Sequence, residues 1–353
     1  MYKKIFMGIA AVAALTLVSC SSDDLNSLSG TPSKNEAISF DSYLGRSAVS
    51  VNGSRGSVLN MDALKKPTEG FGVFGNYIST DETTPTYGEN LFKNQKVTYS
   101  ADETKWTYSP VKYWSPQGHI DFLAYAPYVD GTTLKNTSCI EFTVADNAAN
   151  QKDLLWANAA NQTMANNSGT DKKVNFKFAH ALSRLGYTVK TNTTSSDVTI
   201  TLKKITLAGS VDETTKAFYT AGTIDLSKAN NATDLWTITT PATKQNFTWF
   251  SGTQEVTSTL ASNPNTGYLF VIPQDFSKTE ENADALYVIV EYTIQNGTTE
   301  TMTSTVSSKL AKKLEQGKAY SINLTLGLTP IEFDVTTVEG WTDINQVEIN
   351  SWN

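Results

Sequence analysis

The chain contains little cysteine and little histidine, with two residues of each among 353. Cys20 lies in an N-terminal leader discussed below, so Cys139 has no partner for an intrachain disulfide and packing must hold the fold together. Cys139 lies in a strand-like stretch, where we expect a small buried side chain rather than a reactive thiol. His119 and His180 are isolated in the sequence, and we expect them to be structural, with His180 hydrogen-bonded at a strand bend.

Recognisable catalytic and nucleotide-binding motifs are also lacking. No P-loop, zinc-ligand spacing, G-x-S-x-G elbow or EF-hand loop occurs in the sequence. Charged residues make up only 18%, the net charge is −7 and no basic patch stands out, which argues against a nucleic acid partner. Folding can still bring two distant carboxylates together, so a glycosidase-like pair stays open as an alternative. We expect no catalytic residues, no cofactor and no metal site.

No hydrophobic run is long enough to cross a membrane, but the first residues form a leader. Lys3 and Lys4 precede an apolar run at 5–18, which is too short for a bilayer core of ~30 Å and is typical of a secretory signal. The run ends in Leu-Val-Ser-Cys at Cys20, which resembles the bacterial lipobox. That resemblance implies that residues 1–19 are a signal peptide and that Cys20 is the lipid attachment site. An ordinary signal peptide with a chance cysteine is the alternative.

Residues 20–36 follow the leader and are rich in Ser, Asn, Asp and Gly, a composition typical of a flexible tether. They begin with Ser21-Ser22-Asp23-Asp24 after the cysteine, which resembles the surface-export signal of lipoproteins from the Bacteroides group. We therefore expect a protein anchored to the cell outer membrane by acyl chains and exposed at the surface.

Period-two alternation of apolar residues dominates the remaining sequence and predicts an all-β protein. The clearest face is formed by Leu286, Val288, Val290, Tyr292 and Ile294, and Asn296-Gly297 then predicts a hairpin with a return strand at 299–306. Similar alternation predicts strands at 71–77, 120–126, 320–328 and 331–336. Helical signals are few, and short helices are expected at 61–65 and 308–316.

A polar stretch rich in Asn, Ala, Ser and Gly at 158–171 is the best candidate for a domain boundary. We therefore expect an N-terminal β-sandwich at 37–165 and a C-terminal β-sandwich at 170–353.

Several motifs, taken in order, resemble the fimbrillin-like lipoproteins of Bacteroides-type bacteria. Each motif is short, but together they extend over most of the chain. They are Gly70-Phe71-Gly72-Val73-Phe74 after Asp62-Ala63-Leu64, Pro110-Val111-Lys112-Tyr113-Trp114, the block at 120–128, the block at 178–183, Gly317-Lys318-Ala319-Tyr320, Ile331-Glu332-Phe333 and Trp341.

The resemblance implies two transthyretin-like β-sandwiches and a role as a subunit of type V pili. In family members that polymerise, an arginine-specific protease cuts after an N-terminal strand, and a strand of the next subunit fills the groove. Arg46 and Arg55 are the candidate cleavage sites, although either can be an ordinary solvated loop residue. The segment 331–353 is the candidate donor, with Ile331, Phe333 and Val335 on one face. The alternative for this segment is the last strand of its own domain.

Three functions therefore compete at the level of sequence. The first is a structural or adhesive fimbrial subunit, whose partners are other fimbrillin subunits, the lipoprotein maturation and export machinery, and a host or bacterial surface ligand. The second is a carbohydrate-binding outer-membrane lipoprotein of a glycan-uptake system, since exposed aromatic rings can stack on sugars. The aromatic residues concerned are Trp106, Tyr108, Tyr113, Trp114, Tyr125 and Tyr128, although alternating strand positions favour a place in the core. An enzyme is the third alternative.

Overall fold

The computed structural model describes residues 36–44, 59–80, 91–167, 173–229, 232–259, 261–262, 267–281, 283–298, 300–328 and 332–338. The expected signal peptide and nearly all of the tether lie outside these residues, as do Cys20, Arg46, Arg55 and Ile331. Among the described residues, no helix has the length and apolar character needed to span a bilayer.

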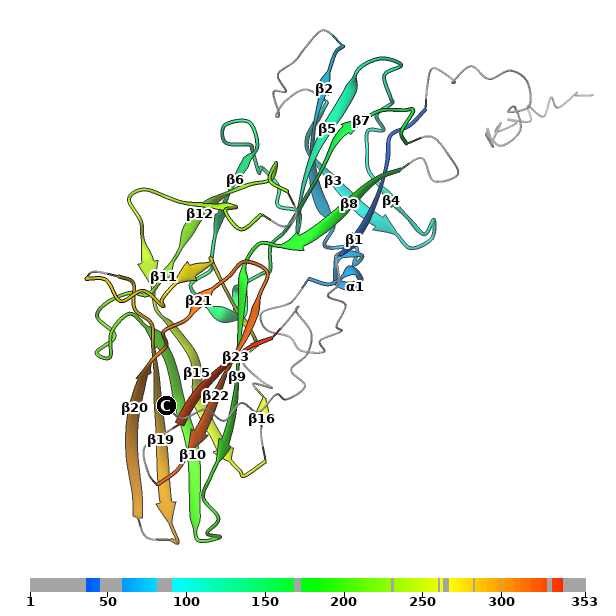
Figure 1. Ribbon diagram of the computed structural model, residues 1–353. Helices are drawn as coiled ribbons and strands as arrows, with labels where there is room; N and C mark the ends of the chain where they lie inside the picture. Colours follow the sequence, from blue (N-terminus) through cyan, green and yellow to red (C-terminus); the bar gives the residue numbers. More distant parts are fainter. Residues whose placement is uncertain are drawn as a thin grey trace, which may run out of the picture. The chain divides into compact units, whose positions relative to one another are not determined.

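The first part of the chain forms a seven-stranded sheet in the order β1-β8-β7-β5-β2-β3-β4 (Figure 1). β1 runs parallel to β8, whereas the other neighbouring strands are antiparallel. The strands predicted at 71–77 and 120–126 are confirmed as β2 and β5. The seven strands are β1 (Ser39–Leu44), β2 (Phe71–Ile78), β3 (Phe92–Ser100), β4 (Lys105–Thr107), β5 (His119–Ala126), β7 (Leu155–Gln162) and β8 (Lys173–His180).

The later part of the chain contributes two larger sheets. One has the order β15-β10-β19-β20, and in the other β9 and β22 lie at the centre with β16, β17 and β23 beside them. The strands of the first are β10 (Val198–Ala208), β15 (Phe247–Val256), β19 (Tyr287–Asn296) and β20 (Glu300–Lys309). Those of the second are β9 (Ser183–Thr191), β16 (Ala261–Ser262), β17 (Leu269–Val271), β22 (Ala319–Leu326) and β23 (Glu332–Val338).

Both of these sheets contribute to one hydrophobic core. Leu202 and Val290 from the first sheet and Tyr187 and Ile322 from the second belong to the same buried cluster. The apolar side chains that alternate along these strands thus lie on the faces of the two sheets that contribute to the same core. A separate buried cluster lies on the seven-stranded sheet and includes Phe40, Phe71, Phe122 and Phe176.

Three small sheets complete the described structure. β6 pairs with β12, which pairs with β13, and this sheet therefore takes strands from both sides of the expected boundary at 158–171. The division into domains at 37–165 and 170–353 stays a prediction. The strands of the small sheets are β6 (Cys139–Thr143), β11 (Phe218–Tyr219), β12 (Ala221–Asp225), β13 (Trp236–Ile238), β14 (Lys244–Gln245), β18 (Gln274–Asp275) and β21 (Lys313–Leu314).

One expected helix is present and one is not. The α-helix α1 (Met61–Leu64) is capped by Asn60, whose side chain accepts a hydrogen bond from the amide of Ala63. A 3₁₀ turn, η1, spans Ala148–Asn150. The helix predicted at 308–316 is wrong, because β20 continues to Lys309 and Lys313–Leu314 pairs with β18.

The hairpin predicted at Asn296-Gly297 is present, with Asn296 opposite Glu300 in the β19–β20 ladder. The connection therefore has three residues rather than the two of a type I′ turn. Gly297 has a φ of 57°, a conformation that glycine adopts without strain.

Candidate functional site

β1 is held at the edge of the seven-stranded sheet by neighbours on both sides. Its ladder with β8 runs from Ser39 opposite Lys173 to Leu44 opposite Phe178. On the other side, the amide of Ile38 donates to the carbonyl oxygen of Lys112 and the amide of Trp114 donates to that of Glu36, both at 2.9 Å. The beginning of β1 therefore lies between β8 and the segment at 112–114.

The side chains of β1 alternate between the core and the surface. Ile38 and Phe40 are each only 2% exposed and Ser42 is also buried, whereas Tyr43 is half exposed. Burying an aliphatic or aromatic side chain is worth about 1.5–3 kcal/mol. Ile38 and Phe40 therefore anchor β1 by filling pockets two residues apart.

The pocket that receives Phe40 is lined by aromatic rings. The Phe40 ring centroid lies 5.5 Å from that of Phe92, 5.5 Å from that of Phe122 and 5.6 Å from that of Phe176. Gly75 makes room for this arrangement, because a Cβ there would lie 2.8 Å from the Phe92 ring and 2.9 Å from the Phe122 ring. Removal of β1 would leave these rings facing an empty groove.

Tyr108 closes the same pocket and adds a polar contact. Its ring centroid lies 5.4 Å from that of Phe40, and its hydroxyl donates a 2.7 Å hydrogen bond to the carbonyl oxygen of Ile38. Burial raises the pKa of Tyr108 to about 12, so the hydroxyl remains a donor at any physiological pH.

The chain leaves β1 at Leu44 and is described again from Leu59, just before α1. Arg46 and Arg55 both fall in this interval of the sequence. The amide of Leu59 donates to Asp153 Oδ2 at 3.2 Å. The far side of the interval is therefore attached to the body of the protein independently of β1.

The candidate donor segment forms the last described strand. β23 is antiparallel to β22, with Phe333 opposite Leu324 and Val335 opposite Ile322. β22 itself is parallel to β9 on its other side. Residues 332–338 thus lie at the edge of a sheet of their own chain, and their use by a neighbouring chain remains a proposal.

The two histidines lie in different surroundings. His180 ends β8 and is buried, with its Nδ1 2.8 Å from Oδ2 of the fully buried Asp153. His180 is thus hydrogen-bonded at the β8–β9 bend, and its structural role stays a prediction. His119 begins β5, and its Nε2 lies 3.9 Å from Asp121 Oδ1. Sequence reasoning missed Asp153, which meets both Leu59 and His180, because its partners are distant in the chain.

The thiol and the aromatic residues singled out from the sequence divide between core and surface. Cys139 begins β6 and is partly exposed, which corrects the expectation of a buried side chain, and partial burial raises the pKa of its thiol. Trp106, Trp114 and Tyr125 are buried, whereas Tyr113 is 55% exposed. The aromatic residues proposed for sugar stacking therefore serve mainly as core.

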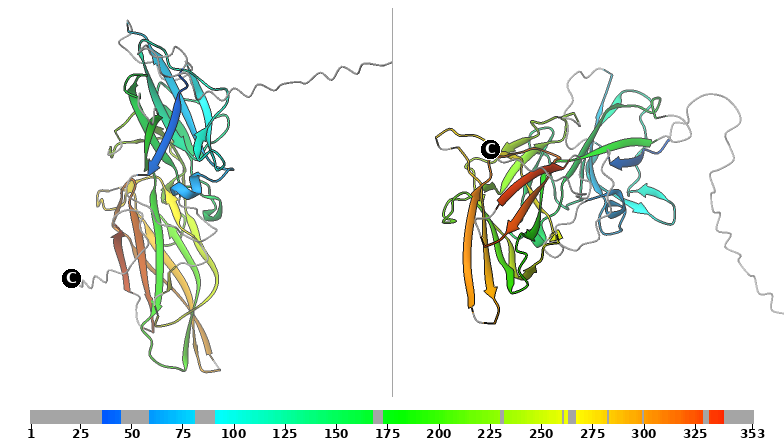
Figure 2. Two further views of the ribbon diagram at one scale, coloured as in Figure 1. Left: turned by 90° about the vertical axis from the view of Figure 1, so that its right-hand side faces the viewer. Right: turned by 60° about the horizontal axis from the view of Figure 1, so that its bottom comes forward.

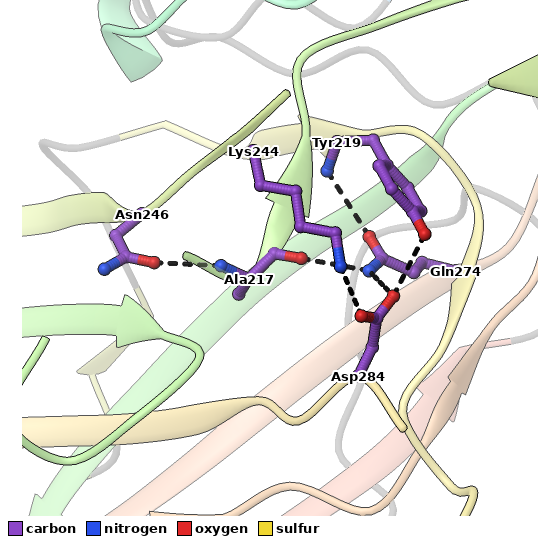
Figure 3. Close-up of polar contacts among 6 residues, drawn as sticks. All are labelled: Ala217, Tyr219, Lys244, Asn246, Gln274 and Asp284. Carbon is purple, nitrogen blue, oxygen red and sulfur yellow. Dashed lines mark hydrogen bonds and ion pairs between the residues drawn. The ribbon is translucent and has the colours of Figure 1, made fainter. Parts of the chain in front are cut away.

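A dense polar cluster joins the small sheets of the later part of the chain (Figure 3). Asp284 accepts hydrogen bonds from the Tyr219 hydroxyl at 3.2 Å and from Gln274 Nε2 at 2.6 Å, and it forms an ion pair with Lys244. Gln274 Nε2 also donates to the carbonyl oxygen of Ala217 at 2.9 Å. The polar groups bind one another and connect β11, β14, β18 and the segment before β19, so the cluster fits a structural role.

The described residues contain no group of three His, Cys, Asp or Glu side chains that could hold a metal ion. Two further features of the described residues are the aromatic pocket that Phe40 of β1 fills and the sheet edge that carries β23.

Both the sequence and the structure of this chain are similar to those of fimbrial proteins. The sequence profile described as fimbrillin-like matches residues 62–341. The structure resembles that of a fimbrial protein from Bacteroides vulgatus, with 20% identity and a TM-score of 0.64, covering 87% of this chain and 100% of that one. A candidate cell adhesion protein from Bacteroides uniformis is similar at 18% identity and a TM-score of 0.50, covering 87% of this chain and 99% of that one. No curated protein sequence matches the chain.

Proposed function

Because the chain belongs to the fimbrillin-like family, we propose that it is a structural or adhesive subunit of a type V fimbria that assembles by β-strand addition. In this proposal β1 is a temporary strand, which proteolysis releases so that a strand of another subunit can take its place. Main-chain hydrogen bonds then provide affinity and the vacated side-chain pockets provide specificity.

The observation that carries this proposal is the distribution of arginine. The sequence contains three arginines, Arg46, Arg55 and Arg184, against 25 lysines (28 Lys and Arg less 3 Arg). Arg184 is 1% exposed within β9, where a protease cannot reach it in the folded protein. Arg46 and Arg55 both lie between β1 and α1 in the sequence. The two arginines other than Arg184 therefore lie in the part of the sequence where a cut would separate β1 from the rest of the chain.

The donor in this proposal is the segment 331–353 of a neighbouring subunit. Ile331, Phe333 and Val335 alternate with polar residues and would occupy successive pockets of the kind that Ile38 and Phe40 fill. The segment would have to leave its place beside β22 to do so. Other fimbrillin subunits are the partners, and a surface ligand of a host or of another bacterium is the target if the subunit is adhesive.

Anchoring at Cys20 completes the proposed function. The lipidated cysteine would attach the subunit to the outer membrane until assembly, and the Ser- and Asp-rich start of the tether would direct it to the surface. The carbohydrate-binding alternative has less support, because Trp106, Trp114 and Tyr125 are buried.

Arginine-specific proteolysis of the purified, folded protein tests the function. We expect mass spectrometry to show cleavage after Arg46 or Arg55 and none after Arg184, and unheated gel electrophoresis to show a ladder of polymers afterwards. The matched variants Arg46→Lys and Arg55→Lys, combined, keep the charge but remove the cleavage sites, and they should abolish both results. A wild-type protein that is cut and never forms a ladder would contradict the proposal.

A further inference from the structure

The strand β6 has an open edge among the described residues. It is the outermost strand of the β13-β12-β6 sheet, and β12 lies on its other side (Figure 1). Hydrogen bonds at its two ends show which residues point toward β12. The Leu226 amide donates to the Ser138 carbonyl oxygen at 3.0 Å, and the Val144 amide donates to that of Thr220 at 2.8 Å.

Residues of even number therefore turn their main-chain groups toward β12, and residues of odd number turn theirs away. Cys139 fits this alternation, because its outward amide and carbonyl both bond to Lys135, at 3.1 and 2.6 Å. Beyond that bridge, the outward main-chain groups of Glu141 and Thr143 face a side of β6 with which no described strand pairs. These amides and carbonyls can bind an added strand.

A cavity of about 290 Å³ lies against this part of β6. Its volume is nearly twice that of the ~150 Å³ apolar cavity that accommodates benzene, so it can hold one large aromatic side chain or two aliphatic ones. The apolar lining includes Tyr125, Ile140, Phe142, Val144, Leu154 and Phe270. An unpaired strand edge beside an apolar pocket is the arrangement required for recognition of an extended peptide.

The charges around the cavity favour an acidic occupant. Glu141 is paired with Lys135 at 3.4 Å, whereas Lys152, which also lines the cavity and is exposed, forms an ion pair with no described carboxylate. A carboxylate on a bound strand would complement it.

The end of this sequence has the matching chemistry. The segment 329–353 contains five acidic residues and no lysine or arginine. Within it, Val347 and Ile349 flank Glu348, and Trp352 follows. In an extended strand Val347 and Ile349 share a face with Asp343, so apolar side chains can fill the cavity while a carboxylate on the same face approaches Lys152.

We propose that β6 is a second acceptor edge, which binds residues 341–353 of another copy of this chain as an added strand, with an apolar side chain in the cavity and a carboxylate near Lys152. The inference rests on the proposed function, since it concerns contact between subunits, but it places the last residues of the donor segment at a site separate from the groove under β1. The first residues of that segment, with Ile331, Phe333 and Val335, are the ones that would fill the groove. A neighbouring subunit would then be bound at two sites, and the overall affinity between subunits would rise without a stronger contact at either site.

Binding of a fluorescently labelled peptide of residues 341–353 to the full chain, followed by fluorescence anisotropy, tests the proposal. Thr143→Pro removes the outward amide of the edge, and its matched control Thr143→Val keeps it. Lys152→Glu reverses the charge beside the cavity, and its control Lys309→Glu makes the same change on an exposed residue of β20. We expect Thr143→Pro and Lys152→Glu each to weaken binding about tenfold or more, and the two controls to bind like wild type. Circular dichroism confirms that each variant is folded.

Several results would overturn the proposal. Equal binding by all variants means that the tail docks elsewhere, and equal binding of a scrambled peptide means that the edge accepts any acidic strand. Binding that appears only after residues 341–353 are deleted from the chain means that its own tail fills the site. In each case the ladder after arginine-specific proteolysis can persist, so the failure of this inference is distinguishable from the failure of the proposed function.

Discussion

The rings of Phe40 and Phe176 are stacked, with their centroids 5.6 Å apart and their planes inclined by 22°. The two residues lie on the parallel strands β1 and β8, more than 130 residues apart in the sequence. Figure 2 shows β1, the dark blue strand, within the sheet formed by the first part of the chain. The ring contact ties β1 to the core of that sheet through a residue that is distant in the sequence, as a strand requires if it is to be held firmly and yet be replaceable.

Replacement of Phe40 measures how strongly β1 is held. Phe40→Ala should lower the free energy of unfolding by about 3–5 kcal/mol, because it leaves a cavity among four aromatic rings. Tyr43→Ala, on the exposed face of the same strand, should change it by less than about 1 kcal/mol. Urea unfolding followed by circular dichroism compares the two, and losses of equal size would show that Phe40 does not anchor β1.

Alternation of apolar residues in the sequence predicts where many strands lie, but it does not predict which strands pair with one another. Ile38 and Phe40 alternate with polar residues, a pattern typical of a strand with one buried face, and both side chains are buried in the structure. The parallel pairing of β1 with β8 could not be foreseen, because the pairing joins distant segments and depends on the whole sheet. The pairing of β6 with β12, on which the open edge depends, is hidden for the same reason.

The wrong helix at 308–316 has a specific cause. Leu310 and Leu314 have the spacing of a helical face, but the amide of Leu310 donates to the carbonyl oxygen of Leu286 at 2.7 Å. Leu314 lies opposite Gln274 in the β18–β21 pair. Main-chain partners supplied by distant strands thus override a local preference worth only tenths of a kcal/mol per residue.

The polar cluster around Asp284 should make stability depend on pH. Burial alone would raise the pKa of Asp284, but hydrogen bonds from Lys244 and Gln274 and the charge of Lys244 lower it below the ordinary value of 3.8. A carboxyl whose pKa is lower in the folded state stabilises the protein above the unfolded pKa, and this contribution is lost as the pH falls through the folded pKa.

Asp284→Asn should therefore lower the melting temperature at pH 7, and the difference from wild type should shrink as the pH falls below 3.8. Asp102→Asn, at an exposed turn, serves as the control and should leave the melting curve unchanged, both at pH 7 and below pH 3.8. Melting curves recorded by circular dichroism across this range provide the comparison. A difference that stays constant with pH would mean that the ionised carboxylate is not what stabilises the cluster.

Lipid attachment can be tested at one residue. Cys20→Ser should abolish labelling of the protein by a fatty-acid analogue in cells and should block normal removal of residues 1–19, because a serine cannot form the thioether to lipid. Cys139→Ser is the matched control and should be labelled like wild type. Undiminished label in the Cys20→Ser protein would exclude the lipoprotein proposal.

The donor role of the last strand is tested by a charge at its centre. Phe333→Asp places a carboxylate where the proposal requires an apolar side chain, and burying an unpaired charge in an apolar pocket is strongly unfavourable. The variant should be exported and cleaved after Arg46 or Arg55 like wild type but should no longer form polymers. Asp334→Asn, one position along, is the control, since it removes a charge from the opposite face of the strand and should leave assembly intact.

The Phe333→Asp variant also has to be shown to fold, because Phe333 lies opposite Leu324 in the β22–β23 ladder. A melting curve compared with that of wild type shows this. A folded Phe333→Asp protein that still forms a ladder after shearing and unheated electrophoresis would place the donor elsewhere in the chain.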